Sequence, residues 1–202
     1  MNAAHTAVIL IGYQNDYFAP HGILHKVIED SARVTGTLKN TIDLIDRLSP
    51  TPTLLISTPI AFTEDYRELM EPVGILRTIK ELGAFQMGTP GSETIAEISR
   101  FGDRILEVPG KRGLNAFSNT ALDDVLSQHA ISHVAVAGAV TSICVDSTGR
   151  AASEKGYSVF VLSDCTVGRT QFEQEFYCQS ILPLYAEVTD HMGFVRRLDI
   201  AV

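Results

Sequence analysis

Largely apolar runs of strand length recur along this chain and alternate with segments of helical periodicity. Residues Thr6–Ile11 form the first run and contain no charged side chain. Continuous runs of this kind are typical of strands that are buried on both faces of a parallel sheet, and this one is expected at the centre of the sheet. Further strands are expected at Thr53–Ser57, Arg104–Val108, Val134–Ala137, Val159–Leu162 and Glu187–Thr189.

The segments between these runs are expected to be helical. Ser31 is a good N-cap for a helix that extends through Leu48 and ends before Pro50. The alternation of strand and helix predicts an α/β fold, a three-layer α/β/α (Rossmann-like) arrangement with a mainly parallel sheet of about six strands. One domain over residues 1–202 accounts for the length, and functional residues are expected at the carboxyl ends of the strands. The other helices are expected at Ala61–Met70, Ile75–Leu82, Thr120–His129 and Thr170–Leu182.

Composition limits the kinds of partner that the chain is expected to bind. The formal charge of −8 argues against nucleic acid and against an anionic membrane surface, which are bound through clustered Lys and Arg. No apolar run is long enough to span a membrane. Three cysteines without a signal segment are expected to be reduced thiols in the cytoplasm. These features favour an enzyme that acts on a small-molecule substrate.

Cys144 lies where an apolar strand is expected to turn into a helix, within the stretch from residue 133 to residue 157. A sulfur in the first turn of a helix lies near unpaired backbone N–H groups and the positive end of the helix dipole, which favour the thiolate. The same position is also compatible with a buried cysteine that only fills space. Cys165 and Cys178 lack this context and are expected to be packing thiols.

Three segments resemble motifs of the isochorismatase-like cysteine hydrolase family. G-A-V-T-S-I-C-V at Gly138–Val145 is similar to the family's G-V-x-T-x-x-C-V, and the Gly-aromatic pair Gly156 and Tyr157 follows it. K-R-G-L-N-A-F-S-N-T-A-L, which begins at Lys111, resembles K-x-x-x-S-A-F-x-x-T-x-L. V-I-L-I-G-Y-Q-N-D-Y-F near the N-terminus resembles V-I-D-x-Q-N-D-F. These motifs span nearly the whole chain in the family's order, so the chain is identified as a member.

The resemblance implies roles for individual residues. Cys144 corresponds to the nucleophile that attacks a carbonyl carbon, and Lys111 corresponds to the ammonium group beside it. A neighbouring ammonium lowers the pKa of a thiol. In the family a non-proline cis peptide bond precedes the motif threonine, so the resemblance places one at Val140–Thr141. The N–H groups of Ile143 and Cys144 are then the expected donors to an oxyanion.

One position departs from the family pattern, because Gly12 stands where the family has a proton-transferring aspartate. Asp16 is the next acid along the chain, but it matches a loop-ordering aspartate of the family. Glu64, Asp65 or a carboxylate of the substrate are alternative proton donors. Without this acid, weak turnover of ordinary amides is expected, with better activity on esters whose leaving group departs unprotonated.

No cofactor and no catalytic metal are expected. Metal-dependent relatives carry histidines after the second strand, whereas residues 57–65 of this chain contain none. His21 and His25 lie in the first loop and are expected to be solvated. The resemblance also implies a homodimer or homotetramer.

Three functions remain open from the sequence. The first is a cysteine hydrolase that cleaves a C–N bond in a small amide-like compound through a thioester on Cys144. The second is an isochorismatase-type hydrolase of a vinyl ether, which depends on the acid that Gly12 replaces. The third is a catalytically impaired family member that acts as a binding protein. A dinucleotide-binding protein is excluded, since the turn after the first strand lacks the required glycine spacing.

Overall fold

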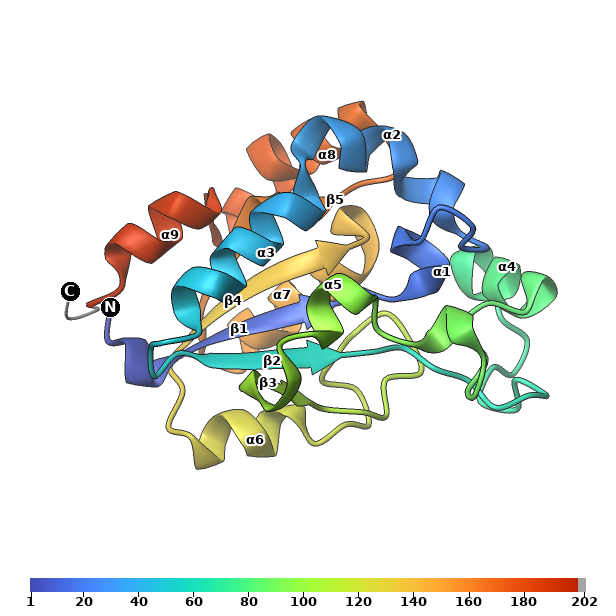
Figure 1. Cartoon of the computed structure of the whole chain (residues 1–202), viewed down its shortest axis with the longest axis horizontal. Helices are drawn as coiled ribbons and strands as arrows, with labels where there is room; N and C mark the ends of the chain where they lie inside the picture. The colour runs from blue at the N-terminus through green and yellow to red at the C-terminus, as the bar shows by residue number, and fades with distance from the viewer. Residues whose placement is uncertain (200–202) are drawn as a thin grey trace.

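Six parallel strands form one sheet in the order β3-β2-β1-β4-β5-β6 (Figure 1). The computed structural model describes residues 1–199, so the last three residues of the expected domain lie outside the described residues. The fold class predicted from the sequence is confirmed, and β1 lies inside the sheet as expected. The strands are β1 (Thr6–Ile11), β2 (Leu54–Thr58), β3 (Ile105–Glu107), β4 (His133–Ala139), β5 (Ser158–Val167) and β6 (Glu187–Thr189).

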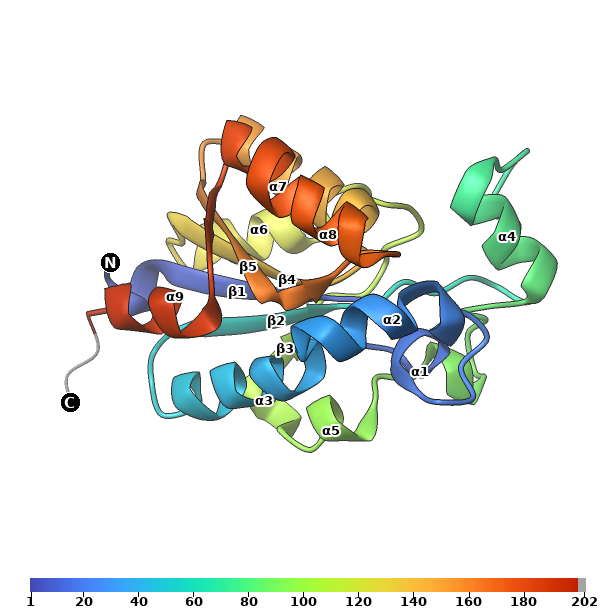
Figure 2. The same cartoon turned by 90° about the horizontal axis from the view of Figure 1, so that it is seen from above.

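Helices cover both faces of the sheet. Figure 2 shows α3, α5 and α9 on one side, and α6, α7 and α8 on the other. The short helix α1 and the helix α4 lie toward the carboxyl ends of the strands. The helices are α1 (Asn15–Phe18), α2 (His25–Thr35), α3 (Thr37–Leu48), α4 (Gly74–Leu82), α5 (Ala96–Ser99), α6 (Leu122–Gln128), α7 (Asp146–Glu154), α8 (Gln171–Phe176) and α9 (His191–Arg197).

Successive residues of the central strands point alternately into two separate cores. Val8 and Leu10 pack with Leu44 of α3, whereas Ile9 packs with Leu126 of α6 on the opposite face. Because side chains alternate along a strand, a shift of one residue would exchange the two sets. Both sets are apolar, which explains why the strand sequences are continuously apolar rather than alternating.

Two helix predictions differ from the structure. The helix expected from Ser31 to Leu48 is two helices, α2 and α3, which meet at Gly36 with a φ of 66°. This left-handed conformation favours glycine and breaks the helix. Ser31 is therefore no N-cap but a buried residue inside α2. The segment 61–70 forms turns instead of a helix, because the Glu68 carboxylate accepts hydrogen bonds from the backbone and hydroxyl of Thr63.

The order of the strands creates a switch point between β1 and β4. From β1 the chain proceeds to β2 and β3 on one side, and from β4 it proceeds to β5 and β6 on the other. In open α/β sheets the crevice at such a point, beyond the carboxyl ends of the strands, is the usual place for a ligand. Gly12 follows β1 directly, and the turn that carries Cys144 follows β4.

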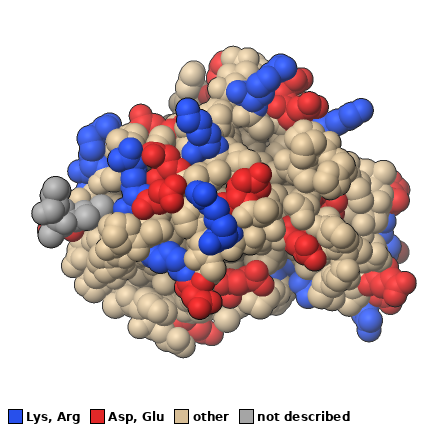
Figure 3. All heavy atoms as spheres, in the orientation of Figure 1, with Lys and Arg blue, Asp and Glu red and all other residues tan. Residues whose placement is uncertain are grey.

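Two further features are the distribution of charge on the surface and the lengths of the helices. On the face shown in Figure 3, positive and negative side chains are interspersed rather than separated into fields of one sign. Within residues 1–199, no helix is both long enough and apolar enough to cross a lipid bilayer.

Candidate active site

Lys111 and Cys144, the two residues that the sequence marks as chemically important, lie in contact. The Lys111 Nζ is 3.5 Å from the Cys144 Sγ. Lys111 comes from the loop after β3, where it forms an isolated parallel bridge with Ile60 of the loop after β2. Cys144 comes from the turn after β4. The contact thus joins the loop after β3 to the turn after β4, across the carboxyl ends of β2 and β1.

The Lys111 ammonium is deeply buried and has no carboxylate partner. Lys111 is 1% exposed and Cys144 is 7% exposed. Among residues 1–199, none of the ion pairs includes Lys111. Burying an unpaired ammonium carries a large desolvation cost. A thiolate on Cys144 would give the site a net charge of zero and offset part of that cost, whereas a neutral thiol would not.

Cys144 lies within a wide helical turn that leads into α7. Thr141–Val145 form this turn, which has the i to i+5 pattern of a π-helix. The Val140 carbonyl accepts hydrogen bonds from the N–H groups of Ile143, at 3.0 Å, and Val145, at 3.2 Å. The Ile143 N–H is therefore already engaged, which argues against the oxyanion role expected for it. The Cys144 N–H remains the proposed donor.

The cis peptide bond lies one residue earlier than expected. It joins Ala139 to Val140, not Val140 to Thr141. β4 stays paired with β5 as far as Ala139, opposite Val167, and the helical turn begins at Thr141. The cis bond therefore lies at the junction between β4 and the helical turn that carries Cys144.

Two residues of α8 hold the turn in front of Cys144. The Thr141 hydroxyl donates a hydrogen bond of 2.5 Å to the Gln174 side chain, and the Ser142 hydroxyl donates one of 2.5 Å to Glu173. Burial raises the pKa of the Glu173 carboxyl, but hydrogen bonds from Arg169 and Ser142 outweigh it and hold this pKa below its usual value. Glu173 is therefore an anion that positions the turn. Sequence analysis missed this pair, because no local pattern links residues 141 and 142 to residues 173 and 174.

Gly12 leaves little room for a side chain. Its φ is 69°, and a Cβ built on it would lie 3.1 Å from the Ala139 carbonyl oxygen. An aspartate at this position would be strained both by the left-handed backbone and by that contact. The turn after β1 is thus built around a glycine, which explains why the family's acid does not fit here.

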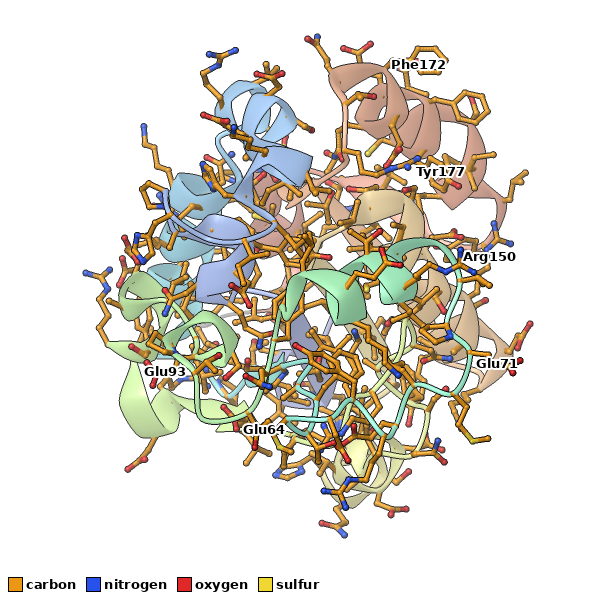
Figure 4. The ribbon with its side chains drawn as sticks, turned by 90° about the vertical axis from the view of Figure 1, so that its right-hand side faces the viewer. Glu64, Glu71, Glu93, Arg150, Phe172 and Tyr177 are labelled. Atoms are coloured by element: carbon orange, nitrogen blue, oxygen red, sulfur yellow. The ribbon has the colours of Figure 1, made fainter. Side chains whose placement is uncertain are left out.

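Of the acids considered as replacements, Asp16 and Asp65 are engaged elsewhere, and Glu64 is exposed. Asp16 is buried, and its carboxylate accepts hydrogen bonds from the backbone N–H groups of Phe85, at 2.6 Å, and Ile23, at 3.4 Å. It therefore ties loops together, as the matching family aspartate was expected to do. Asp65 is exposed and pairs with Arg67. Figure 4 shows Glu64 and Glu93 at separate positions around the carboxyl edge of the sheet, without convergence on one point.

His21 and His25, which the sequence predicts to be solvated, belong to the first loop and its following helix. The possible metal ligands of the described residues lie in another part of the fold than the Lys111–Cys144 pair. His25 contacts the Tyr17 carbonyl through its Nδ1 at 3.0 Å, and His21 is exposed. Within residues 1–199, possible ligand atoms gather within 4.8 Å at Asp164, Cys165 and His191. This group lies on β5 and α9, and both imidazole nitrogens of His191 already face carboxylates, those of Asp164 and Asp43.

A cavity of about 560 Å³ opens beside the Lys111 loop. Its walls come from the loops after β2 and β3, on either side of the Ile60–Lys111 bridge. This volume falls within the range of small-molecule sites. The lining includes Pro59, Ala61, Glu93, Gly110 and Arg112.

Comparison with known proteins places these features in context. The sequence model of the Isochorismatase domain matches residues 6–192. Nicotinamidase 3 of Arabidopsis thaliana is 27% identical over 151 residues, which are 75% of this chain and 71% of that protein. A cysteine hydrolase from Pseudomonas syringae pv. phaseolicola 1448A has a similar structure, with a TM-score of 0.83 and 22% identity over 98% of this chain and 93% of that one. N-carbamoylsarcosine amidase from Thermoplasma acidophilum gives a TM-score of 0.73 and 20% identity, over 95% and 97% of the two chains.

Proposed function

The chain belongs to the isochorismatase domain family of hydrolases, and on this premise we propose that it cleaves a C–N bond in a small amide-like compound through a thioester on Cys144. The contact between the buried Lys111 ammonium and the Cys144 sulfur carries this proposal. A sulfur next to an ammonium is favoured as the thiolate, which is the nucleophilic form.

The reaction follows from this arrangement. The Cys144 thiolate attacks the carbonyl carbon, and the oxyanion that forms accepts a hydrogen bond from the Cys144 backbone N–H. Collapse of the tetrahedral intermediate expels the nitrogen and leaves a thioester. Water then releases the acid and restores the thiolate beside Lys111. Glu173 and Gln174 contribute indirectly, since they fix the turn that presents the sulfur.

The substrate class rests on the relatives and on the size of the cavity. Two of the similar proteins are named for amide-type substrates, a nicotinamidase and an N-carbamoylsarcosine amidase. The cavity beside the Lys111 loop has room for a molecule of that size; Gly110 and Arg112, which flank Lys111, line it, whereas Lys111 and Cys144 do not. Glu93 and Arg112 bring both signs of charge to its walls, which favours a polar small molecule over an apolar one.

A binding protein without catalysis is the second candidate, and Gly12 is the observation that favours it. The first-strand position of the family's acid cannot hold a carboxylate without strain. Against it stands the buried Lys111–Cys144 pair, since a binding pocket has no need of an ammonium with only a sulfur as partner. A vinyl-ether hydrolase is disfavoured by Gly12, because that chemistry depends on the acid.

Cys144 is expected to be the fastest of the three thiols to react with iodoacetamide. Burial raises the pKa of Cys165 well above its usual value and that of Cys178 to about 11. Because a raised pKa keeps the protonated form at neutral pH, Cys178 should react about tenfold faster per pH unit from pH 6 to 9, with little alkylation at pH 7. Peptide mass spectrometry measures all three rates, and faster alkylation of Cys165 or Cys178 would refute the nucleophile assignment.

We also propose that the chain works as a homodimer or homotetramer in the cytoplasm. Met70, Val73, Phe172 and Leu184 are large apolar side chains that are 70% or more exposed. Contiguous apolar patches are typical of association surfaces, so these side chains are the candidates for one. Light scattering at micromolar concentration should give a mass that is a multiple of 22.0 kDa. A monomer mass would contradict this proposal.

A further inference from the structure

The ring of Tyr17 occupies the space beside Gly12. A Cβ built on Gly12 would lie 3.5 Å from the Tyr17 Cδ2 and 3.7 Å from its Cε2. The space into which an acid at position 12 would extend is thus next to the edge of a phenol ring. The motif that this segment resembles, V-I-D-x-Q-N-D-F, has a phenylalanine where this chain has Tyr17. Relative to that motif, this chain lacks the carboxyl group at position 12 and has an additional hydroxyl group at position 17, whose ring lies beside position 12.

The Tyr17 hydroxyl has no hydrogen-bond partner among residues 1–199, although the residue is only 3% exposed. Two other buried tyrosines differ in this respect. The hydroxyl of Tyr13 donates to the Cys165 carbonyl at 2.8 Å, and that of Tyr66 donates to the Ala84 carbonyl at 2.8 Å. Among residues 1–199, the fully buried side-chain oxygens without a partner are the hydroxyls of Ser31 and Thr53. The Tyr17 hydroxyl is not one of them, so it keeps some contact with solvent and is open to a ligand. The ring itself is fixed against Phe85, with 5.0 Å between centroids.

Tyr17 packs against the turn that carries Cys144, since it shares an apolar cluster with Ala139 and Val140, and Ile143 packs against the same cluster. Burial is the largest cause that raises the Tyr17 pKa above its usual range, and negative charge at Cys144 and at Asp16 raises it further. Because the pKa is raised, the hydroxyl carries its proton at neutral pH. Tyr17 is therefore a protonated donor close to the nucleophile.

We infer that the Tyr17 hydroxyl supplies the proton that the leaving nitrogen takes up, in place of the carboxyl that Gly12 excludes. The inference rests on the proposed thioester mechanism and adds a catalytic residue to it. The sequence alone predicts weak turnover of ordinary amides, because no acid is present to protonate the leaving nitrogen. With Tyr17 as the proton donor, this step is possible and amides are expected to be substrates.

The proton and charge balance are complete without any further reagent. The S–C bond forms as the carbonyl electron pair moves to oxygen, and the C–N bond then breaks while nitrogen takes the Tyr17 proton. The site now holds a neutral thioester, a phenolate and the Lys111 ammonium, so its net charge stays zero. Water gives one proton back to the phenolate as its oxygen attacks the thioester carbon. Collapse returns the electron pair to sulfur and releases the carboxylic acid.

Acylation also makes Tyr17 a better acid at the moment when its proton is needed. In the resting site, negative charge on the Cys144 sulfur opposes ionisation of the phenol. Once the sulfur is bonded to the acyl carbon, that charge has moved from the sulfur to the carbonyl oxygen. The sulfur then no longer opposes ionisation of the phenol.

Comparison of p-nitroacetanilide with p-nitrophenyl acetate tests this role, because the two substrates share the acetyl group. The anilide needs a proton on its leaving nitrogen, whereas nitrophenolate departs without one. Tyr17→Phe is expected to lower hydrolysis of the anilide by about 10²–10⁴-fold. Hydrolysis of the ester should stay within about threefold of the wild-type rate, because that step does not use the proton.

Tyr66→Phe is the matched control, since it removes a buried tyrosine hydroxyl from the same apolar cluster. It should leave both rates within about threefold of wild type, at a cost of about 1 kcal/mol in stability. An equal loss on both substrates in Tyr17→Phe, or no loss on the anilide, overturns the inference. The inference is also overturned if wild-type protein hydrolyses the ester but not the anilide. If wild-type protein forms no acetyl adduct on Cys144 with the ester, the proposed function itself fails.

Discussion

Cys144→Ala is expected to lower hydrolysis of both a small amide and the matching ester by about 10⁴-fold or more, the scale seen when a covalent nucleophile is removed. The effect is large because no other thiol can replace this sulfur. Cys165 is fully buried, and burial keeps the thiol of Cys178 protonated at neutral pH. Initial rates with a p-nitrophenyl ester, together with the mass of the intact protein during turnover, measure the loss and the missing acyl adduct.

Cys165→Ala is the control for this experiment. It also removes a buried thiol, but from the core between β5 and α3, away from the Lys111–Cys144 pair. Its activity should remain within a few-fold of wild type, with a lower stability from the small cavity. Retention of turnover in Cys144→Ala would show that the sulfur is not the nucleophile and would favour a mechanism in which water attacks directly.

The sequence predicted the parts of this site that follow from topology. Gly12, Lys111 and Cys144 each come soon after a strand, and the carboxyl ends of parallel strands share one edge. Their assembly could therefore be expected before any coordinates were known. The prediction that the cis bond follows Val140 was wrong by one residue, because the motif does not reveal where the pairing of β4 with β5 ends.

The supporting contacts could not be predicted, since they join segments far apart in the chain. Glu173 reaches Ser142 across 31 positions, and nothing in the sequence of α8 distinguishes it from an exposed helical glutamate. Tyr17 was overlooked for a different reason. A tyrosine in a short helix after a strand is usually a packing residue, and only the coordinates show that its hydroxyl lacks a partner and that its ring lies beside Gly12. The break between α2 and α3 depends on a positive φ at Gly36, which many sequences with an internal glycine do not adopt.

The charge balance of the site leads to a second large effect, one in which activity and stability change in opposite directions. Lys111→Met keeps the length of the side chain and removes the ammonium beside Cys144. Activity should fall on the order of 10²–10³-fold, as when one electrostatic stabiliser of an active site is lost. Alkylation of Cys144 near neutral pH should slow, because the thiolate loses its counter-ion and takes up a proton instead.

Stability should not fall with activity in Lys111→Met. A buried ammonium is costly to desolvate, and an apolar side chain of similar shape removes that cost, while the sulfur can become a neutral thiol. The melting temperature should therefore equal or exceed that of the wild type, as is usual for a residue that serves function at a cost in stability.

Lys155→Met provides the matched control, since it removes a lysine that forms a surface ion pair with Asp123 at 2.8 Å. There, activity should be unchanged and stability should shift by about 1 kcal/mol or less. A Lys111→Met protein that melts much earlier than wild type, with normal alkylation of Cys144, would mean that this lysine supports the fold rather than the thiolate.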